Sequence, residues 1–253
     1  MSKSTSVSTY KSDAPAVNPE VVEDVPDADV HVFRGHLCVT GSLGRPTPKG
    51  LSALDLRLHY SEGFVPLWVK NTILHYRFQP YTLRWFKDPD SAKADILKLL
   101  AEALDMWGDA APVRFKEDAD VWDFEIVVRN ADECNSAGCV LASAFFPDEG
   151  RHELVIYPKM FKQTRTEQVE TLIHELGHVF GLRHWFAHLT EKDWPTEVFG
   201  CQCEFSIMNY GEKSYLTPAD KSDLALLYRK VWSGELEDID GTRVKLFKSY
   251  SAH

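Results

Sequence analysis

The stretch HELGHVFGLRH, residues 174–184, combines three histidines, a glutamate and a glycine at a spacing typical of a catalytic zinc site. A helix presents residues i and i+4 on one face, so His174 and His178 can each offer an imidazole nitrogen to the same ion. Glu175 is rotated by about 100° around the helix axis from the first histidine. It can therefore reach a water on the metal without being a ligand. Because the apolar stripe of this helix faces the other way, we expect both histidines to line an open cleft.

His184 can be the third ligand only if the helix ends before it, because an unbroken helix would place it roughly 15 Å along the axis from His174. Gly181 lies where the chain must turn, and glycine enters the left-handed conformation at little steric cost. We therefore expect three histidine ligands around one zinc ion. The alternatives are an amphipathic helix with solvent-facing histidines, or a closed structural zinc site, which would want a fourth protein ligand and has no use for Glu175.

The overall composition argues against several classes of function. The chain has 253 residues, of which 44% are hydrophobic, so it can bury the core of one or two domains. Its net charge is -10 and it has no basic stripe, which argues against nucleic acid as a partner. No apolar run approaches the ~20 residues of a membrane span. We expect a monomer that binds neither membrane nor nucleic acid.

Localisation and cysteine chemistry stay open at this point. Residues 1–30 lack an apolar segment suited to a signal peptide. This favours a cytoplasmic or unconventionally secreted protein, or an extracellular one if the native start is missing. The cysteines can form one or two bridges near the site in an oxidising compartment, or stay thiols in a reducing one. They are Cys38, Cys134, Cys139, Cys201 and Cys203.

The chain divides into three parts by composition. Residues 1–30 are rich in Ser, Thr, Pro and acidic residues and predict a disordered tail. Residues 31–64 contain one short apolar stretch followed by a Gly/Pro-rich one, and predict an N-terminal extension or pro-like segment. Residues 65–253 have the hydrophobic patterns of a folded domain and carry the histidine motif.

Strands are predicted where apolar residues alternate with polar ones. Residues 67–78, LWVKNTILHYRF, alternate, with Leu74, Tyr76 and Phe78 on one face, and predict one strand. Further strands are predicted at 112–117, 122–129, 139–147 and 152–158.

Helices are predicted where apolar residues recur at helical spacing. One helix is expected over 91–107, and the motif helix is expected to begin at a capping box formed by Thr164 and Glu167. A closing helix should begin after the N-cap Thr217 and end near Trp232. Together with the strands, these helices indicate a twisted sheet backed by helices.

The motif and the residues after it resemble the metzincin clan of zinc endopeptidases, whose extended motif H-E-x-x-H-x-x-G-x-x-H is followed by a turn containing methionine. Here that turn would be SIMNY, with Met208 packed beneath the metal. The resemblance implies an α+β, zincin or metzincin-like catalytic domain. Its parts are a twisted, mostly parallel sheet with an antiparallel edge strand, an active-site helix, a Met-turn and a C-terminal helix.

Residues 66–232 are also similar in layout to the matrixin catalytic domain. The sequence LASAFFP resembles the edge strand of that family, whose backbone receives the substrate peptide as an added strand. The resemblance therefore implies a substrate-binding role for four consecutive residues, Ala142, Ser143, Ala144 and Phe145.

The turn departs from the matrixin pattern. Matrixins commonly place a tyrosine directly after the methionine, whereas Asn209 intervenes here and Tyr210 follows, as in astacin-like and serralysin-like enzymes. The resemblance to those enzymes implies that Tyr210 can ligate zinc at rest and stabilise the transition state. The alternative is a tyrosine packed under the turn.

The metal content is also expected to differ from that of matrixins. The histidine-rich loop that holds a second zinc in that family is missing, with only His152 nearby, so we expect one zinc ion per chain. Asp148, Glu149 and Gly150 are a weakly supported candidate for a calcium loop, and a solvated turn is favoured there.

The sequence thus predicts a zinc-dependent endopeptidase that acts on proteins or peptides, with Glu175 as general base and Tyr210 assisting. The alternatives are a non-cleaving, zinc-containing protein-binding module of the same fold and a zinc hydrolase of non-peptide amides. Cys38 raises a latency hypothesis, since matrixin propeptides plug zinc with a cysteine. However, RGHLCVTG does not match that switch motif, and a small buried hydrophobe is the favoured interpretation of Cys38.

Overall fold

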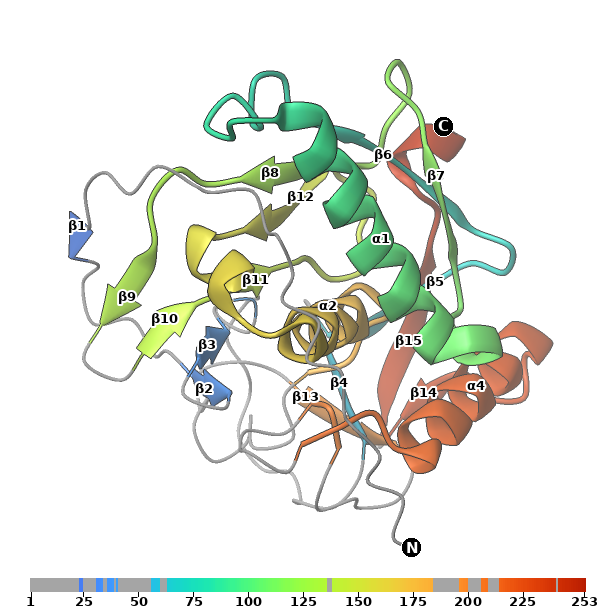
Figure 1. The fold of residues 1–253 in the computed structure, drawn as a ribbon. Coiled ribbons are helices and arrows are strands. Elements are labelled where there is room, and N and C mark those ends of the chain that lie inside the picture. Colours follow the sequence, from blue (N-terminus) through green and yellow to red (C-terminus); the bar gives the residue numbers. More distant parts are fainter. Residues whose placement is uncertain are drawn as a thin grey trace, which may run out of the picture.

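A five-stranded sheet forms the centre of the molecule, with the strand order β11-β12-β8-β6-β7 (Figure 1). Its strands are parallel except for the edge strand β11, which is antiparallel to β12. This confirms the predicted α+β fold class. The computed structural model describes residues 23–24, 31–33, 36–38, 40, 56–59, 63–135, 138–183, 196–199, 206–208, 214–239 and 241–253. The sheet comprises β6 (Ile73–Phe78), β7 (Arg114–Glu117), β8 (Phe124–Val128), β11 (Ala142–Ser143) and β12 (His152–Ile156).

Two helices, α1 and α2, pack against each other beside the sheet (Figure 1). The indole Nε1 of Trp107, at the end of α1, donates to the carbonyl of Ile173 in α2 at 3.0 Å, so the two helices are held by a polar contact inside an apolar interface. None of the helices in the described ranges is both long enough and apolar enough to cross a bilayer. The helices are α1 (Pro89–Trp107), α2 (Arg165–Val179) and α4 (Pro218–Ser233), with short 3-10 turns η2 (Gly108–Ala110) and η3 (Pro158–Lys162).

The single strand predicted over residues 67–78 is wrong, because the chain forms two strands there. Strand β5 (Phe64–Trp68) ends before a turn in which Asn71 has a φ of 65°, and β6 begins at Ile73. Asparagine adopts this left-handed conformation more readily than other non-glycine residues. The turn moves β5 out of the central sheet and into a second one.

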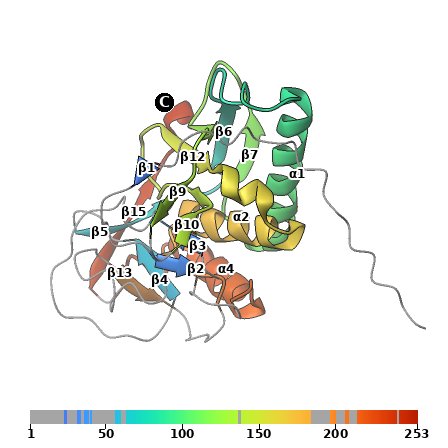
Figure 2. The same cartoon turned by 60° about the vertical axis from the view of Figure 1, so that its left-hand side comes forward.

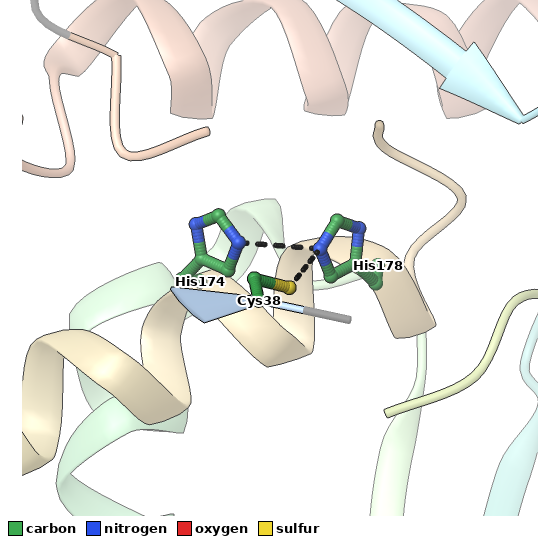
Figure 3. Close-up of side chains that lie close together, drawn as sticks. All are labelled: Cys38, His174 and His178. Carbon is green, nitrogen blue, oxygen red and sulfur yellow. Dashed lines mark hydrogen bonds between the residues drawn. The ribbon is translucent and has the colours of Figure 1, made fainter. Parts of the chain in front are cut away.

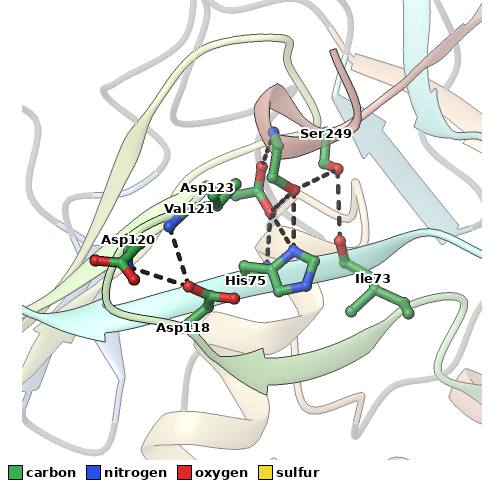
Figure 4. A network of polar contacts seen from close by, with 8 residues as sticks. Ile73, His75, Asp118, Asp120, Val121, Asp123 and Ser249 are labelled. Atoms are coloured by element: carbon green, nitrogen blue, oxygen red, sulfur yellow. Dashed lines mark hydrogen bonds and ion pairs between the residues drawn. The ribbon is translucent and has the colours of Figure 1, made fainter.

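That second sheet is completed by residues from the far end of the chain. Strand β15 (Thr242–Phe247) runs parallel to β5 and antiparallel to β14 (Asp238–Ile239). A buried carboxylate then fixes the residues that follow β15 to the central sheet (Figure 4). Asp123 accepts hydrogen bonds from the Ser251 amide at 2.6 Å, the Ser251 hydroxyl at 2.8 Å and the His75 amide at 2.6 Å. These three donors satisfy a carboxylate that burial would otherwise disfavour.

A third sheet combines strands from residues before position 40 with a disulfide-bonded hairpin, in the order β1-β9-β10-β3-β2 (Figures 1 and 2). Strand β3 runs parallel to β10, with His36 opposite Cys139 and Leu37 opposite Val140. The Cys134–Cys139 bridge ties β9 to β10. The strands are β1 (Glu23–Asp24), β2 (His31–Phe33), β3 (His36–Cys38), β9 (Glu133–Asn135) and β10 (Gly138–Val140), and a separate pair joins β4 (Leu56–His59) to β13 (Thr196–Phe199).

The predicted division at residues 30 and 64 stays a prediction. Of the predicted tail, Glu23–Asp24 form β1, and its other residues lie outside the described part of the chain. Cys201 and Cys203 lie outside it as well.

Candidate active site

Helix α2 carries the first half of the histidine motif. It begins at the predicted capping box, in which Thr164 accepts from the Glu167 amide and Glu167 accepts from the Thr164 amide. Residues 171–179 are all buried, so the last part of the helix runs through the interior. His174 is 2% exposed and His178 is 0% exposed. In the described part of the chain the two histidines therefore do not line an open cleft as the sequence predicted, and the Cys38 sulfur lies 3.4 Å from His178 Nε2.

The two histidine rings are oriented by backbone carbonyls. His174 Nδ1 lies 2.9 Å from the carbonyl oxygen of Ile207, and His178 Nδ1 lies 2.8 Å from that of Leu182. A carbonyl only accepts, so each Nδ1 carries the hydrogen and each Nε2 keeps its lone pair. The two Nε2 atoms face each other at 3.2 Å (Figure 3). Two lone pairs that point at each other repel unless a cation or a proton lies between them. This pair of Nε2 atoms therefore fits the ligands of a zinc ion.

The helix ends where the motif requires it to end. Its last residue is Val179, and Gly181 has a φ of 94°, in the left-handed region that favours glycine. The Gly181 amide donates to the His178 carbonyl at 2.8 Å, and the Leu182 amide donates to the Gly177 carbonyl at 2.9 Å. The chain thus turns away from the helix axis directly after the second histidine. His184 itself lies outside the described residues, so its part as third ligand stays a prediction.

Met208 packs against Gly177 of α2. A Cβ atom at Gly177 would lie 2.4 Å from the sulfur of Met208, which is a steric clash. A glycine inside a helix lowers the stability of the helix by about 1 kcal/mol relative to alanine. At position 177 it allows the Met208 side chain to approach the helix backbone closely. Asn209 and Tyr210 lie outside the described residues, so the Met-turn and the role of Tyr210 stay predictions.

Glu175 is buried, and its carboxyl group has three hydrogen-bond donors around it. Thr40 Oγ1 donates to Glu175 Oε2 at 2.8 Å, the Cys38 thiol lies 3.4 Å from Glu175 Oε1, and the Ala144 amide also interacts with the carboxyl group. Burial raises the pKa of Glu175 to about 8, although these hydrogen bonds lower it. In this closed site, burial therefore favours the protonated form of the carboxyl group near neutral pH.

Cys38 lies at the histidine pair. Its sulfur is 3.4 Å from His178 Nε2, and Cys38, His174 and His178 together form a cluster whose ligand atoms lie within 4.8 Å of one another (Figure 3). Burial, and then the Glu175 carboxylate, raise the pKa of the thiol well above its usual value. A bound cation would act in the opposite direction and favour the thiolate. Cys38 is therefore buried, as the sequence interpretation favoured, and also placed where a metal ligand would be.

The predicted substrate strand is shorter than expected but lies beside the site. Ala142–Ser143 form β11, and Ala144 and Phe145 continue beyond it as buried residues. The Ala144 amide donates to Thr40 Oγ1 at 2.8 Å. The Phe145 ring stacks on His152 with centroids 4.4 Å apart. The substrate-binding role of these four residues stays a prediction.

The weak calcium candidate has the geometry of a turn. Asp148 Oδ1 accepts from the Gly150 amide at 2.7 Å, an interaction that closes the turn on itself. Its calcium role is untested.

Sequence reasoning missed two residues of the site. Gly177 had a signal, because glycine in the middle of a well-patterned helix usually has a packing reason. Thr40 had none, since a threonine 135 residues before Glu175 is ordinary in sequence and acquires meaning only from the fold.

Comparison with known proteins is consistent with the geometry. Residues 67–189 match the family model of the matrixins, described as "Peptidase_M10: Matrixin". Macrophage metalloelastase of Rattus norvegicus is 30% identical over 168 residues, 58% of this chain and 33% of that protein. The Oryctolagus cuniculus protein of the same name is 31% identical over 131 residues, 47% of this chain and 26% of that protein. The chain thus spans a third or less of the length of these relatives.

Similar solved structures are more distant. A crystal structure of myroilysin is 16% identical, with a TM-score of 0.42 over 83% of this chain and 99% of that one. High choriolytic enzyme 1, a hatching enzyme zinc-protease from Oryzias latipes, is 13% identical, with a TM-score of 0.40 over 73% of this chain and 98% of that one. Likeness at this level carries no weight for function. By its histidine motif, its sheet and its matrixin match at residues 67–189, the chain resembles the metzincins.

Proposed function

We propose that this protein is a zinc-dependent endopeptidase in which His174 and His178 hold the metal and Glu175 is the general base. The observation that carries the proposal is the pair of Nε2 atoms 3.2 Å apart, each with its Nδ1 fixed by a carbonyl, beside a buried carboxyl group. The matrixin match supports a peptide bond as the target. The substrate class would be proteins or peptides.

Different residues of the chain would have different roles in hydrolysis. When bound, zinc would lower the pKa of a coordinated water and polarise a carbonyl oxygen. Glu175 would take a proton from the attacking water and later deliver it to the leaving amine. The residues from Ala142 to Phe145 would hold the substrate in an extended conformation by pairing with its backbone.

Two further residues belong to the proposal although the structure does not describe them. His184 would be the third ligand, since it lies three residues after the turn at Gly181. Tyr210 would assist Glu175 by donating a hydrogen bond to the developing oxyanion.

We also propose that residues 31–64 act as a pro-like segment that keeps this site closed. The supporting observation is Cys38, whose sulfur lies 3.4 Å from His178 Nε2. A thiolate and two imidazoles are a ligand set that zinc prefers. In this state the Cys38 sulfur would occupy the position that a water needs.

The test uses a chain whose site is opened. Because Cys38 and Thr40 contact the site residues, we would compare the zinc-loaded variant Cys38→Ala/Thr40→Val with the same variant carrying Glu175→Gln. The measurements are cleavage of an unfolded, fluorescently quenched protein and the zinc content by elemental analysis. Loss of a general base should slow cleavage by roughly 10²- to 10⁴-fold, while one zinc per chain is retained. A chelator should abolish cleavage and added zinc should restore it.

The alternative function is a non-cleaving, zinc-containing protein-binding module. It would be favoured if the opened chain held one zinc per chain and cleaved nothing. Equal cleavage with Glu175 and with Gln at that position would contradict the proposed mechanism. Cleavage of non-peptide amides alone would move the substrate class to a different zinc hydrolase.

A further inference from the structure

We propose that Thr40 is a second anchor of the N-terminal segment, which blocks the general base Glu175 directly and independently of Cys38. This inference deepens the proposed function and rests on it. It assigns a positioning role to a residue that the sequence motif does not include.

The Thr40 hydroxyl joins the two groups that catalysis needs free. It donates to Glu175 Oε2 at 2.8 Å and accepts from the Ala144 amide at 2.8 Å. A hydroxyl has one hydrogen to donate, and in Thr40 that hydrogen is committed to the carboxyl group. All three residues are buried, so bulk water does not compete for these bonds.

The position of this hydroxyl is the one that the attacking water would require. A water that gives its proton to Glu175 must first donate a hydrogen bond to that carboxyl group. Thr40 makes this bond instead. It also occupies the Ala144 amide, which directly follows the edge strand β11 proposed to receive the substrate. The N-terminal segment would thus compete with the attacking water for Glu175 and with the substrate for the Ala144 amide.

The backbone brings Thr40 to this place. Strand β3 pairs with β10 through His36 opposite Cys139 and Leu37 opposite Val140. Strands β3 and β10 are parallel, so the residues that follow them leave the sheet at the same end, toward the site. Thr40 therefore meets the residues just beyond Ala142.

The anchors at Cys38 and Thr40 contact different atoms. The Cys38 sulfur lies near His178 Nε2 and Glu175 Oε1, whereas Thr40 binds Glu175 Oε2. Removing the sulfur therefore leaves the second oxygen of the carboxyl group held. If the inference is right, loss of Cys38 opens the site only in part, and loss of the Thr40 hydroxyl opens it further.

The test compares four full-length, zinc-loaded chains: Cys38→Ala alone, and Cys38→Ala combined with Thr40→Val, Thr40→Ser or Thr72→Val. Valine removes the hydroxyl at nearly constant volume and serine keeps it. Thr72 is the matched control, because it is buried and its hydroxyl donates to the Val69 carbonyl at 2.7 Å, between β5 and β6. The readouts are cleavage rate, melting temperature, and hydrogen exchange of the amides of residues 36–38.

Leaving one partner of a buried hydrogen bond unsatisfied shifts an equilibrium by roughly five- to a hundredfold. We expect Thr40→Val to raise the cleavage rate and the exchange at residues 36–38 by about that factor. Thr40→Ser and Thr72→Val should leave both at the level of Cys38→Ala. Thr40→Val should lower the melting temperature no more than Thr72→Val does.

Two results would overturn the inference, and they differ from failure of the proposed function. Unchanged exchange at residues 36–38 in Thr40→Val shows that Thr40 is no anchor, whether or not the chain cleaves. Faster exchange with cleavage equal to that of Cys38→Ala shows an anchor that does not block the base. Faster exchange with no cleavage by any of the four chains instead overturns the proposed function, and the blocking of a base with it.

Discussion

Two sheets meet at the candidate site, and they are built very differently. In the central sheet, all five residues of β8 are buried and the strands pair through registers of up to five residues. In the sheet β1-β9-β10-β3-β2, every strand has two or three residues, and three of the five strands come from residues before position 40. The first sheet has a core of its own, whereas the second depends on a disulfide and on a segment borrowed from far away in sequence.

The division also runs through the site. His174, His178 and Glu175 belong to a helix packed in the main core, while Cys38 and Thr40 belong to the added layer. Under the proposed function, the residues of hydrolysis and the residues that would block them therefore lie in separate parts of the molecule. A change in one part should therefore leave the other largely intact, which can be tested.

The largest effect is expected in the central sheet. Leu74 in β6 is fully buried, so Leu74→Ala removes apolar contacts and leaves a cavity. We expect the free energy of unfolding in urea to fall by about 4 kcal/mol. Leu246→Ala in β15, at a side chain that is 38% exposed, is the control and should cost less than about 1 kcal/mol. Similar decreases in the free energy of unfolding in both variants would mean that packing in the central sheet does not contribute most to stability.

A smaller and local effect is expected in the added layer. Replacing Cys134 and Cys139 by serine removes a cross-link between β9 and β10, which should ease the opening of that hairpin by about 2 kcal/mol. Hydrogen exchange of residues 36–38 in β3 should accelerate, while exchange of residues 124–128 in β8 should stay as in the unmodified chain. If β8 exchanged faster too, the two sheets would be one cooperative unit rather than two.

The smallest effect concerns pH at His152 in β12, whose ring stacks on Phe145. Burial against Phe145 lowers the pKa of His152 from its usual value of 6.5, so the folded state resists protonation more than the unfolded state does. Stability from the neutral ring is present above pH 6.5 and is lost as the pH falls below it. We expect the unfolding free energy of His152→Gln to depend less on pH between about 7.5 and 5.5 than that of the unmodified chain. His253→Gln, at an exposed position, should keep the original pH dependence.

Sequence alone was sufficient for features that depend on local patterns. The helices α1, α2 and α4, the capping box of α2 and the N-cap of α4 follow from apolar spacing and from local side-chain signals, whereas the parallel sheet with its antiparallel edge followed from the metzincin resemblance. Residues that act through long-range packing could not be found in this way. The contact of Gly177 with Met208, the pairing of β15 with β5 and the bond from Thr40 to Glu175 each join segments whose separation along the chain carries no signal.

The boundaries of the site were also set by tertiary contacts. In α1, Leu97 is only partly buried whereas Leu99 is buried, so apolar spacing alone does not define the face of this helix that packs in the core. The histidines were expected to line an open cleft, but they are buried and Cys38 contacts His178. Periodicity shows which face of a helix is apolar, but not which other part of the chain will cover the polar face.

The bonds between Asp123 and Ser251 have a consequence for biosynthesis. His75, beside this carboxylate, contacts a serine 176 residues later in the chain, and β5 finds its partner β15 at a similar distance. At roughly 5–20 residues per second, a ribosome needs about 10–35 seconds to make that span. During this time the exposed edge of β5 has no partner from its own chain. The edge of β5 that β15 later covers is therefore open to pairing with other chains until β15 has been made.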